Sequence, residues 1–119
     1  MGFMLELDSL IVACGSENFK EQFFSEKAWY PVSISSEKLC NIKYLFAYQK
    51  SPIASITHMA EVESILLIEG TKKYKIIFKN TPIKINNIPM GKDQRNVPQN
   101  PRYANSQRVH KAINMDNIF

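Results

Sequence analysis

The segment from Lys43 to Val62 reads KYLFAYQKSPIASITHMAEV and predicts two neighbouring strands joined by a tight turn. Residues 44–50 alternate between two sets of side chains, because successive residues of a strand face opposite ways. Ser51-Pro52 is typical of a turn, and residues 56–65 predict the second strand. By strict alternation, one face of that strand should carry Ile56, His58, Ala60 and Val62, and the other Thr57, Met59, Glu61 and Glu63.

The flanking sequence predicts further strands and short helices around this pair. We expect strands at 10–14, 29–34, 73–79 and 83–85, and helices at 16–27 and from Asn105 or Ser106. Residues 35–39 predict a short helix or a turn, and Pro89 to Asn105 a long loop. Phe19, Phe23 and Phe24 share one face of the 16–27 helix, where an aromatic stripe usually packs against the core. This order of elements is typical of an α+β domain whose strands close into a small barrel.

The 119 residues suffice for one domain, which we place at 1–119. The formal charge of +4 is unevenly distributed, at −4 over residues 1–69 and +8 over residues 70–119. A basic half indicates an anionic partner, with nucleic acid first. With no apolar run of about 18 residues and acidic residues near the start, we expect a cytoplasmic protein without membrane contact.

Cysteine and histidine usage argues against a structural metal site. Cys14 and Cys40 are 26 positions apart, and the chain has only two histidines, His58 and His110. A zinc site normally needs four such ligands at short spacings. We therefore expect no metal or other cofactor, and two buried free thiols.

Lysine, arginine and aromatic residues supply the candidate contacts to nucleic acid. Lys73, Lys75 and Lys79 should form a row on the outer face of one strand, while Lys92, Arg95 and Arg102 lie in the long loop. Trp29, Tyr30, Tyr48 and Tyr103 are candidates for stacking on bases. The alternative for each aromatic residue is that it completes the core, and for His58 that it is a hydrogen-bonded core histidine.

No catalytic template fits the sequence, which has no Gly-x-Ser-x-Gly, phosphate-binding glycine loop or His-Glu-x-x-His. Glu61 and Glu63 lie two apart on a predicted strand and so share a face. Such a pair is able to serve acid–base chemistry, but more often it forms a solvated edge.

The segment from Lys43 to Val62 resembles the centre of PUA-like domains, with the EVE and ASCH branches nearest. Trp29-Tyr30 before it and Pro101-Arg102-Tyr103 after it resemble the flanks of small stand-alone relatives, whereas the Trp-Asp-Gly-Val-Arg-Asn run of EVE domains is absent. The resemblance implies a pseudo-barrel of five to six mostly antiparallel strands with flanking helices. Such relatives mostly bind RNA or a modified nucleobase, which implies RNA rather than DNA as the partner here.

From these observations we predict a nucleic-acid-binding module that holds a base in an aromatic pocket. The predicted binding residues are Trp29, Tyr30, Tyr48, Gln49, Ser55, Thr57, His58, Lys73, Lys75, Lys79, Lys92, Arg95, Arg102 and Tyr103. The resemblance to ASCH amidohydrolases leaves a second hypothesis, a hydrolase of modified nucleosides using Lys43, Thr57 and Glu61 or Glu63. A third is a module that binds another protein.

Overall fold

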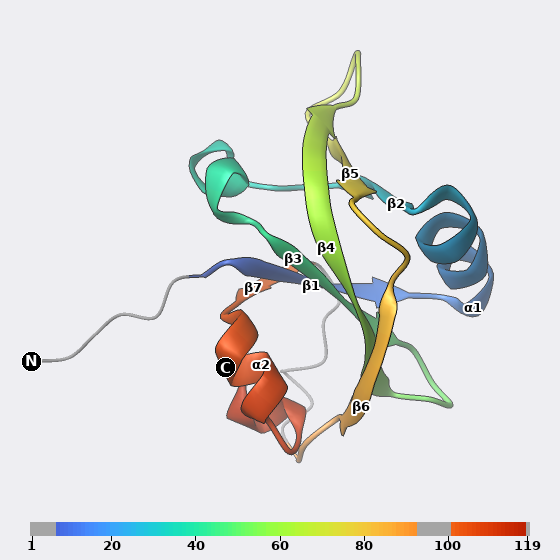
Figure 1. Cartoon of the computed structure of the whole chain (residues 1–119), viewed down its shortest axis with the longest axis vertical. Coiled ribbons are helices and arrows are strands. Elements are labelled where there is room, and N and C mark those ends of the chain that lie inside the picture. Colours follow the sequence, from blue (N-terminus) through green and yellow to red (C-terminus); the bar gives the residue numbers. More distant parts are fainter. Residues whose placement is uncertain (1–6, 93–100, 119) are drawn as a thin grey trace, which may run out of the picture.

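The computed structural model describes residues 7–92 and 101–118, which form a set of strands and several short helices (Figure 1). The elements are β1 (Ser9–Cys14), α1 (Ser16–Asn18), η1 (Phe19–Glu26), β2 (Ala28–Val32), η2 (Ser36–Asn41), β3 (Tyr44–Gln49), β4 (Ser55–Leu67), β5 (Tyr74–Phe78), β6 (Ile83–Pro89), β7 (Arg102–Ala104), α2 (Ser106–Lys111) and η4 (Met115–Asn117). No helix within these residues is both long and apolar enough to cross a bilayer.

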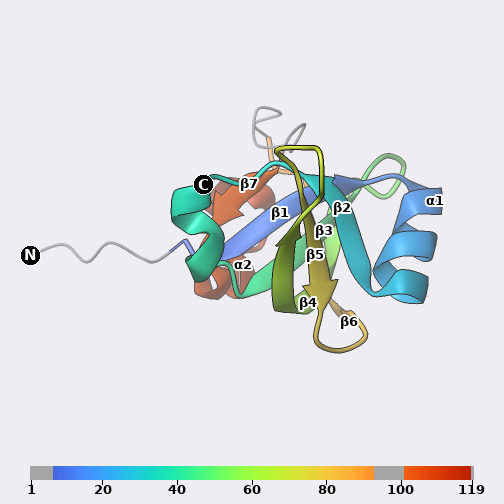
Figure 2. The same cartoon turned by 90° about the horizontal axis from the view of Figure 1, so that it is seen from above.

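The strands form one curled sheet in the order β2-β5-β4-β3-β1-β7, with β6 also paired to β4. β1 and β3 run parallel, and the other described strand pairs are antiparallel. Figure 2 shows α1 and α2 at different sides of this sheet. The α+β class and the curled sheet of mostly antiparallel strands with flanking helices are therefore confirmed. The prediction of a continuous loop from Pro89 to Asn105 was wrong at its end, because residues 102–104 form β7.

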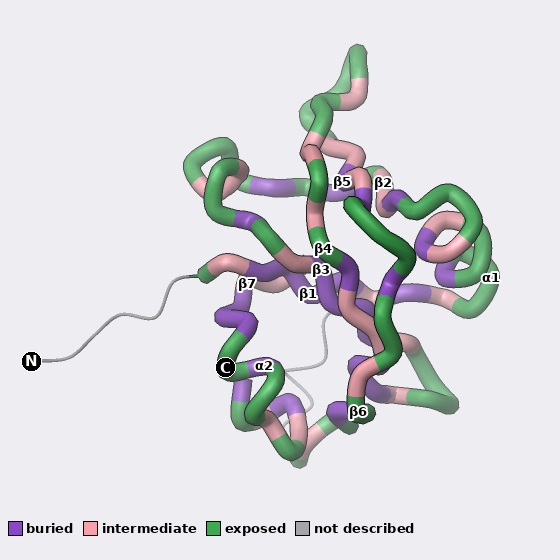
Figure 3. Tube along the Cα trace, in the orientation of Figure 1, coloured by how far each residue is buried: buried purple, intermediate pink, exposed green. Residues whose placement is uncertain are grey.

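The central strands β1 and β3 are buried on both faces, which explains why both sets of alternating residues in them are apolar. One face of β3 adds Leu45 and Ala47 to a core cluster that includes Phe23 of η1. The opposite face adds Phe46 and Tyr48 to a second cluster, which α2 and η4 cover. In Figure 3 the buried stretches concentrate where these strands cross, while the tip of the β4–β5 hairpin is exposed.

β4 does not alternate as predicted, because its ladders with β3 and β6 are irregular at Thr57. Ala47 of β3 pairs with His58, but the next residue, Tyr48, pairs with Ile56, so Thr57 is an extra residue. A bulge of this kind turns the following side chains to the other face. Ile56 thus packs in the second cluster, whereas His58 lies against aromatic rings of the first. The prediction that these two share a face was wrong.

β6 extends beyond the predicted strand 83–85 and includes Pro89. Proline has no N–H to donate, so it is tolerated only where a strand edge is free. Among the described strands, β6 pairs with β4 alone. Its outer edge is therefore free to hold Pro89, which lies opposite Ser55.

The two cysteines lie in different environments. Cys14 is buried, and burial raises the pKa of its thiol to about 12, although Lys50 acts in the opposite direction. Cys40 is exposed on η2, so the expectation that both thiols are buried was wrong at this position.

Candidate functional site

The aromatic residues predicted to stack on bases do not line one pocket. Trp29 packs beside Phe23 in the first cluster, with 5.6 Å between ring centroids. Tyr48 is only 3% exposed and belongs to the second cluster, and burial raises the pKa of its phenol. The Tyr103 hydroxyl accepts a hydrogen bond from the Ser35 N–H at 2.8 Å. These three rings complete the core or tie a loop to it.

The lysines predicted on the strand at 73–79 are exposed or half-buried, but each already has a partner. Lys73 donates to the Ser33 hydroxyl at 2.8 Å. Lys79 lies 3.6 Å from Glu61, and both side chains are largely exposed. Lys75 Nζ stands 4.6 Å from the centroid of the Tyr30 ring.

Tyr30 has an additional contact on this outer face. Its hydroxyl donates to Glu26 at 2.7 Å, and this hydrogen bond, with a smaller effect of desolvation, raises the pKa of the phenol. Tyr30 and Lys75 are therefore the one predicted aromatic–cation pair that the described structure brings into contact.

The basic residues predicted in the long loop are not gathered beside that row. Arg95 lies outside the described residues. Arg102 is half-buried on β7, which three strands separate from β5 in the sheet order. Lys92 is exposed, and its backbone N–H donates to Asp116 at 2.8 Å.

The structure does bring together Gln49, Thr57 and His58, which we call the bulge site. Gln49 Nε2 donates to Thr57 Oγ1 at 2.6 Å, and Thr57 Oγ1 lies 2.8 Å from His58 Nδ1. The bulge makes this possible, because it turns two consecutive β4 residues toward the same side. When the Thr57 hydroxyl donates to Nδ1 of a neutral ring, the ring proton is on Nε2. The chain of bonds then ends in a Gln49 carbonyl oxygen and a His58 N–H.

Two phenylalanines from η1 hold the His58 ring. The ring centroids of Phe19 and Phe24 lie 5.0 Å and 5.3 Å from it, both with edge-on geometry. His58 is half-buried, and this desolvation, followed by the positive charge of Lys84, lowers the pKa of its imidazole. A pKa below the ordinary value of about 6.5 favours a neutral ring at pH 7, in which Nδ1 is free to accept from the Thr57 hydroxyl.

The bulge site lies beside the carboxyl ends of β1 and β3, which meet at one edge because these strands are parallel. Cys14 pairs with Gln49, and the Lys50 N–H donates to the Cys14 carbonyl at 3.2 Å. The next residues along the chain, Gly15, Ser16, Glu17 and Asn18, line an open pocket of about 320 Å³. Ser55, buried at the start of β4, donates instead to the Ile53 carbonyl at 3.1 Å.

Lys84 and Phe24 belong to this site, although they were missing from the predicted binding residues. Lys84 of β6 pairs with His58, and Phe24 supplies a half-buried ring. The aromatic face of the helix was visible in the sequence. The position of Lys84 was not, since it depends on the pairing of β6 with β4.

The low pKa of His58 has a direct test. A proton NMR titration of the imidazole should place its pKa below the ordinary value of about 6.5. Lys84→Gln should raise that pKa part of the way back, because it removes a positive charge and leaves the burial unchanged. Lys72→Gln, in the exposed β4–β5 turn, is the control and should leave the pKa of His58 unchanged. A His58 pKa of 6.5 or higher in the unmodified protein would contradict this environment.

The residues of the hydrolase hypothesis are not placed together. Lys43 and Glu61 lie near the junction of β3 and β4, where Tyr44 pairs with Glu61. Thr57 is four residues away along β4, about 13 Å at the usual rise per residue. Glu61 pairs with Lys79, and Glu63 is exposed. Nor do three or more His, Cys, Asp or Glu side chains gather as metal ligands anywhere in residues 7–92 and 101–118.

Comparison with known proteins identifies the fold through structure alone. No protein-family model matches the sequence, and no curated protein matches it significantly. Three crystal structures of an ASCH protein from Zymomonas mobilis do match. A serine-to-alanine mutant, ZmASCH, gives a TM-score of 0.62 at 16% identity, over 91% of this chain and 96% of that chain.

The other two structures agree with the first. A tyrosine-to-phenylalanine mutant gives a TM-score of 0.57 at 14% identity, over 87% of this chain and 95% of that one. The ASCH structure without a stated substitution gives a TM-score of 0.57 at 15% identity, over 88% of this chain and 93% of that chain. The match spans nearly the whole of both chains, so this protein shares the fold of these ASCH structures, as the resemblance of the segment from Lys43 to Val62 implied.

Proposed function

We propose that this ASCH-like domain binds single-stranded nucleic acid, RNA in preference to DNA, at the bulge site. The observation that carries the proposal is the hydrogen-bonded run of Gln49, Thr57 and His58 at the carboxyl ends of the parallel strands. Its two ends, a carbonyl oxygen and an N–H, match the mixed acceptors and donors on the edge of a base. The resemblance to PUA-like domains is the reason for naming RNA first.

Cations beside the bulge site support binding of the phosphate backbone. Lys50 and Lys84 are exposed, and both act electrostatically on groups of this region, Lys50 on Cys14 and Lys84 on His58. The Lys84 ammonium donates to the Ile85 carbonyl and to the Asn87 side chain. An ammonium has three protons, so one is left for a phosphate. Phe24 adds a half-buried ring at the rim of the site.

The proposal is tested by fluorescence anisotropy with labelled U6 and A6 RNA and the corresponding DNA hexamers. Two phosphate contacts predict a slope of about −1.4 for log K against log salt, since each contributes about −0.7 on a single strand. Affinity should therefore fall about sevenfold between 50 and 200 mM salt. Lys84→Gln should reduce the slope to about −0.7, whereas Lys72→Gln should leave it unchanged.

His58→Phe separates base contact from phosphate contact. The substitution keeps an aromatic ring against Phe19 and Phe24 but removes the N–H, so it should weaken binding about fivefold at every salt concentration. RNA binding that is undetectable at 25 mM salt, or independent of salt, would refute the proposal. Tighter binding of the DNA hexamers would refute the preference for RNA.

A further inference from the structure

The β4–β6 ladder, like the β3–β4 ladder that forms the bulge site, is irregular at Thr57, and it leaves a pocket beside β6. Ile56 pairs with Ile88 and His58 pairs with Lys84, so β4 has one residue between these pairs and β6 has three. The extra residues make β6 bow outward. The Lys84 ammonium holds the bow by donating to the Ile85 carbonyl and the Asn87 side chain.

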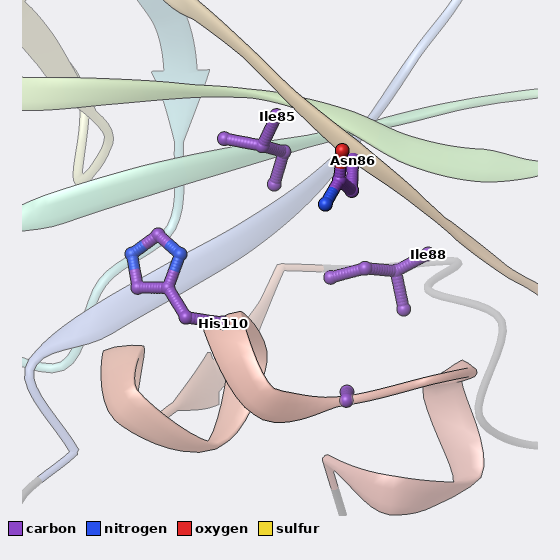
Figure 4. Close-up of a pocket in the computed structure, with 5 residues that line it drawn as sticks. Ile85, Asn86, Ile88 and His110 are labelled. Atoms are coloured by element: carbon purple, nitrogen blue, oxygen red, sulfur yellow. The ribbon is translucent and has the colours of Figure 1, made fainter.

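The space between this bow and α2 is a cavity of about 330 Å³, which we call the β6–α2 pocket (Figure 4). It is lined by Ile85, Asn86, Ile88, His110 and Ala112. Its volume is at the lower end of the range of about 300–1,000 Å³ for small-molecule sites. Ile88 is buried in the second cluster and Ile85 and Ala112 pack against it, so these three give the pocket an apolar wall.

Two polar side chains at this pocket are free to bind a ligand. Asn86 and His110 are both exposed, and neither side chain forms a hydrogen bond with another described residue. The His110 ring packs edge-on against Phe46, with 5.6 Å between centroids, which restrains its orientation. Figure 4 shows both side chains bordering the same opening. An amide and an imidazole together offer donors and acceptors beside an apolar surface, as a flat nitrogen heterocycle requires.

The charge around the pocket favours an anionic ligand. α2 ends in Arg108, His110 and Lys111 and has no acidic residue among its six. A nucleotide combines the required features, with a planar base for the apolar wall and a phosphate for Arg108 and Lys111.

We propose that the β6–α2 pocket is a second base subsite, which takes a nucleotide of the same strand whose neighbour lies at the bulge site. The inference rests on the proposed function and extends it from one base to at least two. Lys84 borders the bulge site and Ile85 lines the pocket, so consecutive residues of β6 connect the two. The outer edge of β6 is unpaired in the described chain, and the nucleic acid crosses that edge from one face of the sheet to the other.

The two histidines of the chain allow the two sites to be observed separately, because His58 belongs to one and His110 to the other. Addition of A6 RNA to the full chain should shift the proton NMR signals of both imidazole rings, and both shifts should occur at the same concentration of RNA. Ala112→Phe, which fills the pocket, should abolish the His110 shift, keep the His58 shift and weaken A6 binding about tenfold. Ile113→Phe adds the same ring at a side chain that is 81% exposed and should behave like the unmodified protein.

Each result of this titration has a distinct meaning. A shift of His58 without His110 would overturn the second subsite and leave the proposed function in place. A shift of His110 alone would overturn the bulge site and the two-base arrangement. If neither ring responds, both proposals fail. Equal affinities of Ala112→Phe and Ile113→Phe for A6 would also overturn the second subsite.

Discussion

Replacing Phe23 with alanine should lower the free energy of unfolding by about 3–5 kcal/mol, the usual cost of deleting a fully buried phenylalanine. Phe23 has no exposed surface and joins η1 to the sheet. Its ring centroid lies 4.8 Å from that of Phe78 and 5.6 Å from that of Trp29. The cavity left by alanine would remove contacts to β5, which carries Phe78, and to β2, which carries Trp29. Urea unfolding followed by circular dichroism measures this loss.

Two further variants keep the prediction testable if Phe23→Ala does not fold. Phe23→Leu retains most of the buried volume and should lose a smaller part of the stability. Leu67→Ala removes a side chain that is 60% exposed at the hairpin tip and should change stability by less than about 0.5 kcal/mol. A loss below about 1 kcal/mol for Phe23→Ala would show that the helix is not anchored through this ring.

Asp8→Asn should cost about 1–2 kcal/mol at pH 7, because it weakens charged hydrogen bonds that connect the start of β1 to α2. The Asp8 carboxylate accepts bonds from the Ser106 N–H at 2.8 Å, the Ser106 hydroxyl at 2.7 Å and the Ser9 hydroxyl at 3.0 Å. Partial burial acts to raise the pKa of Asp8, but these hydrogen bonds outweigh it and lower the pKa. The expected loss is small because solvent screens the half-buried carboxylate.

The pH dependence of this effect has a defined sign. Since the pKa of Asp8 is lower in the folded state, its contribution is complete above the unfolded value of about 3.9. It is lost as the pH falls through the folded value. Unfolding curves of Asp8→Asn and the unmodified protein should therefore differ at pH 7, and the difference should shrink as the pH falls below about 3.9. Glu69→Gln, in the exposed hairpin turn, is the matched control. A difference between Asp8→Asn and the unmodified protein that stays constant as the pH is lowered from 7 into the acid range would contradict the role of the charge.

Local pattern was sufficient to predict most of the secondary structure. Residues 44–50 alternate with apolar side chains on both sides, and β3 is buried on both faces as a result. The three phenylalanines in 19–24 predicted the face of the helix that packs on the sheet. Asn105 caps α2 by accepting from the Arg108 N–H at 3.1 Å, as its side chain suggested.

The composition of the candidate site was harder to predict, because it depends on strand pairing. Aromatic residues near lysines suggested stacking, but Tyr48 fills the core and Tyr103 ties a loop. The sequence does not distinguish an aromatic side chain that packs in the core from one that stacks on a base. The contact between His58 and Phe24 depends on the bulge at Thr57, and strict alternation excludes it.

The sequence by itself determined the class of the fold and the sign of its charge. Periodicity and turn residues are local properties, so they specify strands and helices wherever the chain is read. Only the tertiary structure decided which polar residues meet. The bulge in β4 and the bow in β6 arise from a mismatch in register between distant segments, and that mismatch turns Thr57 and His58 to one side. The basic half of the chain likewise forms no single surface in the described structure, because the sheet places its lysines on separate strands.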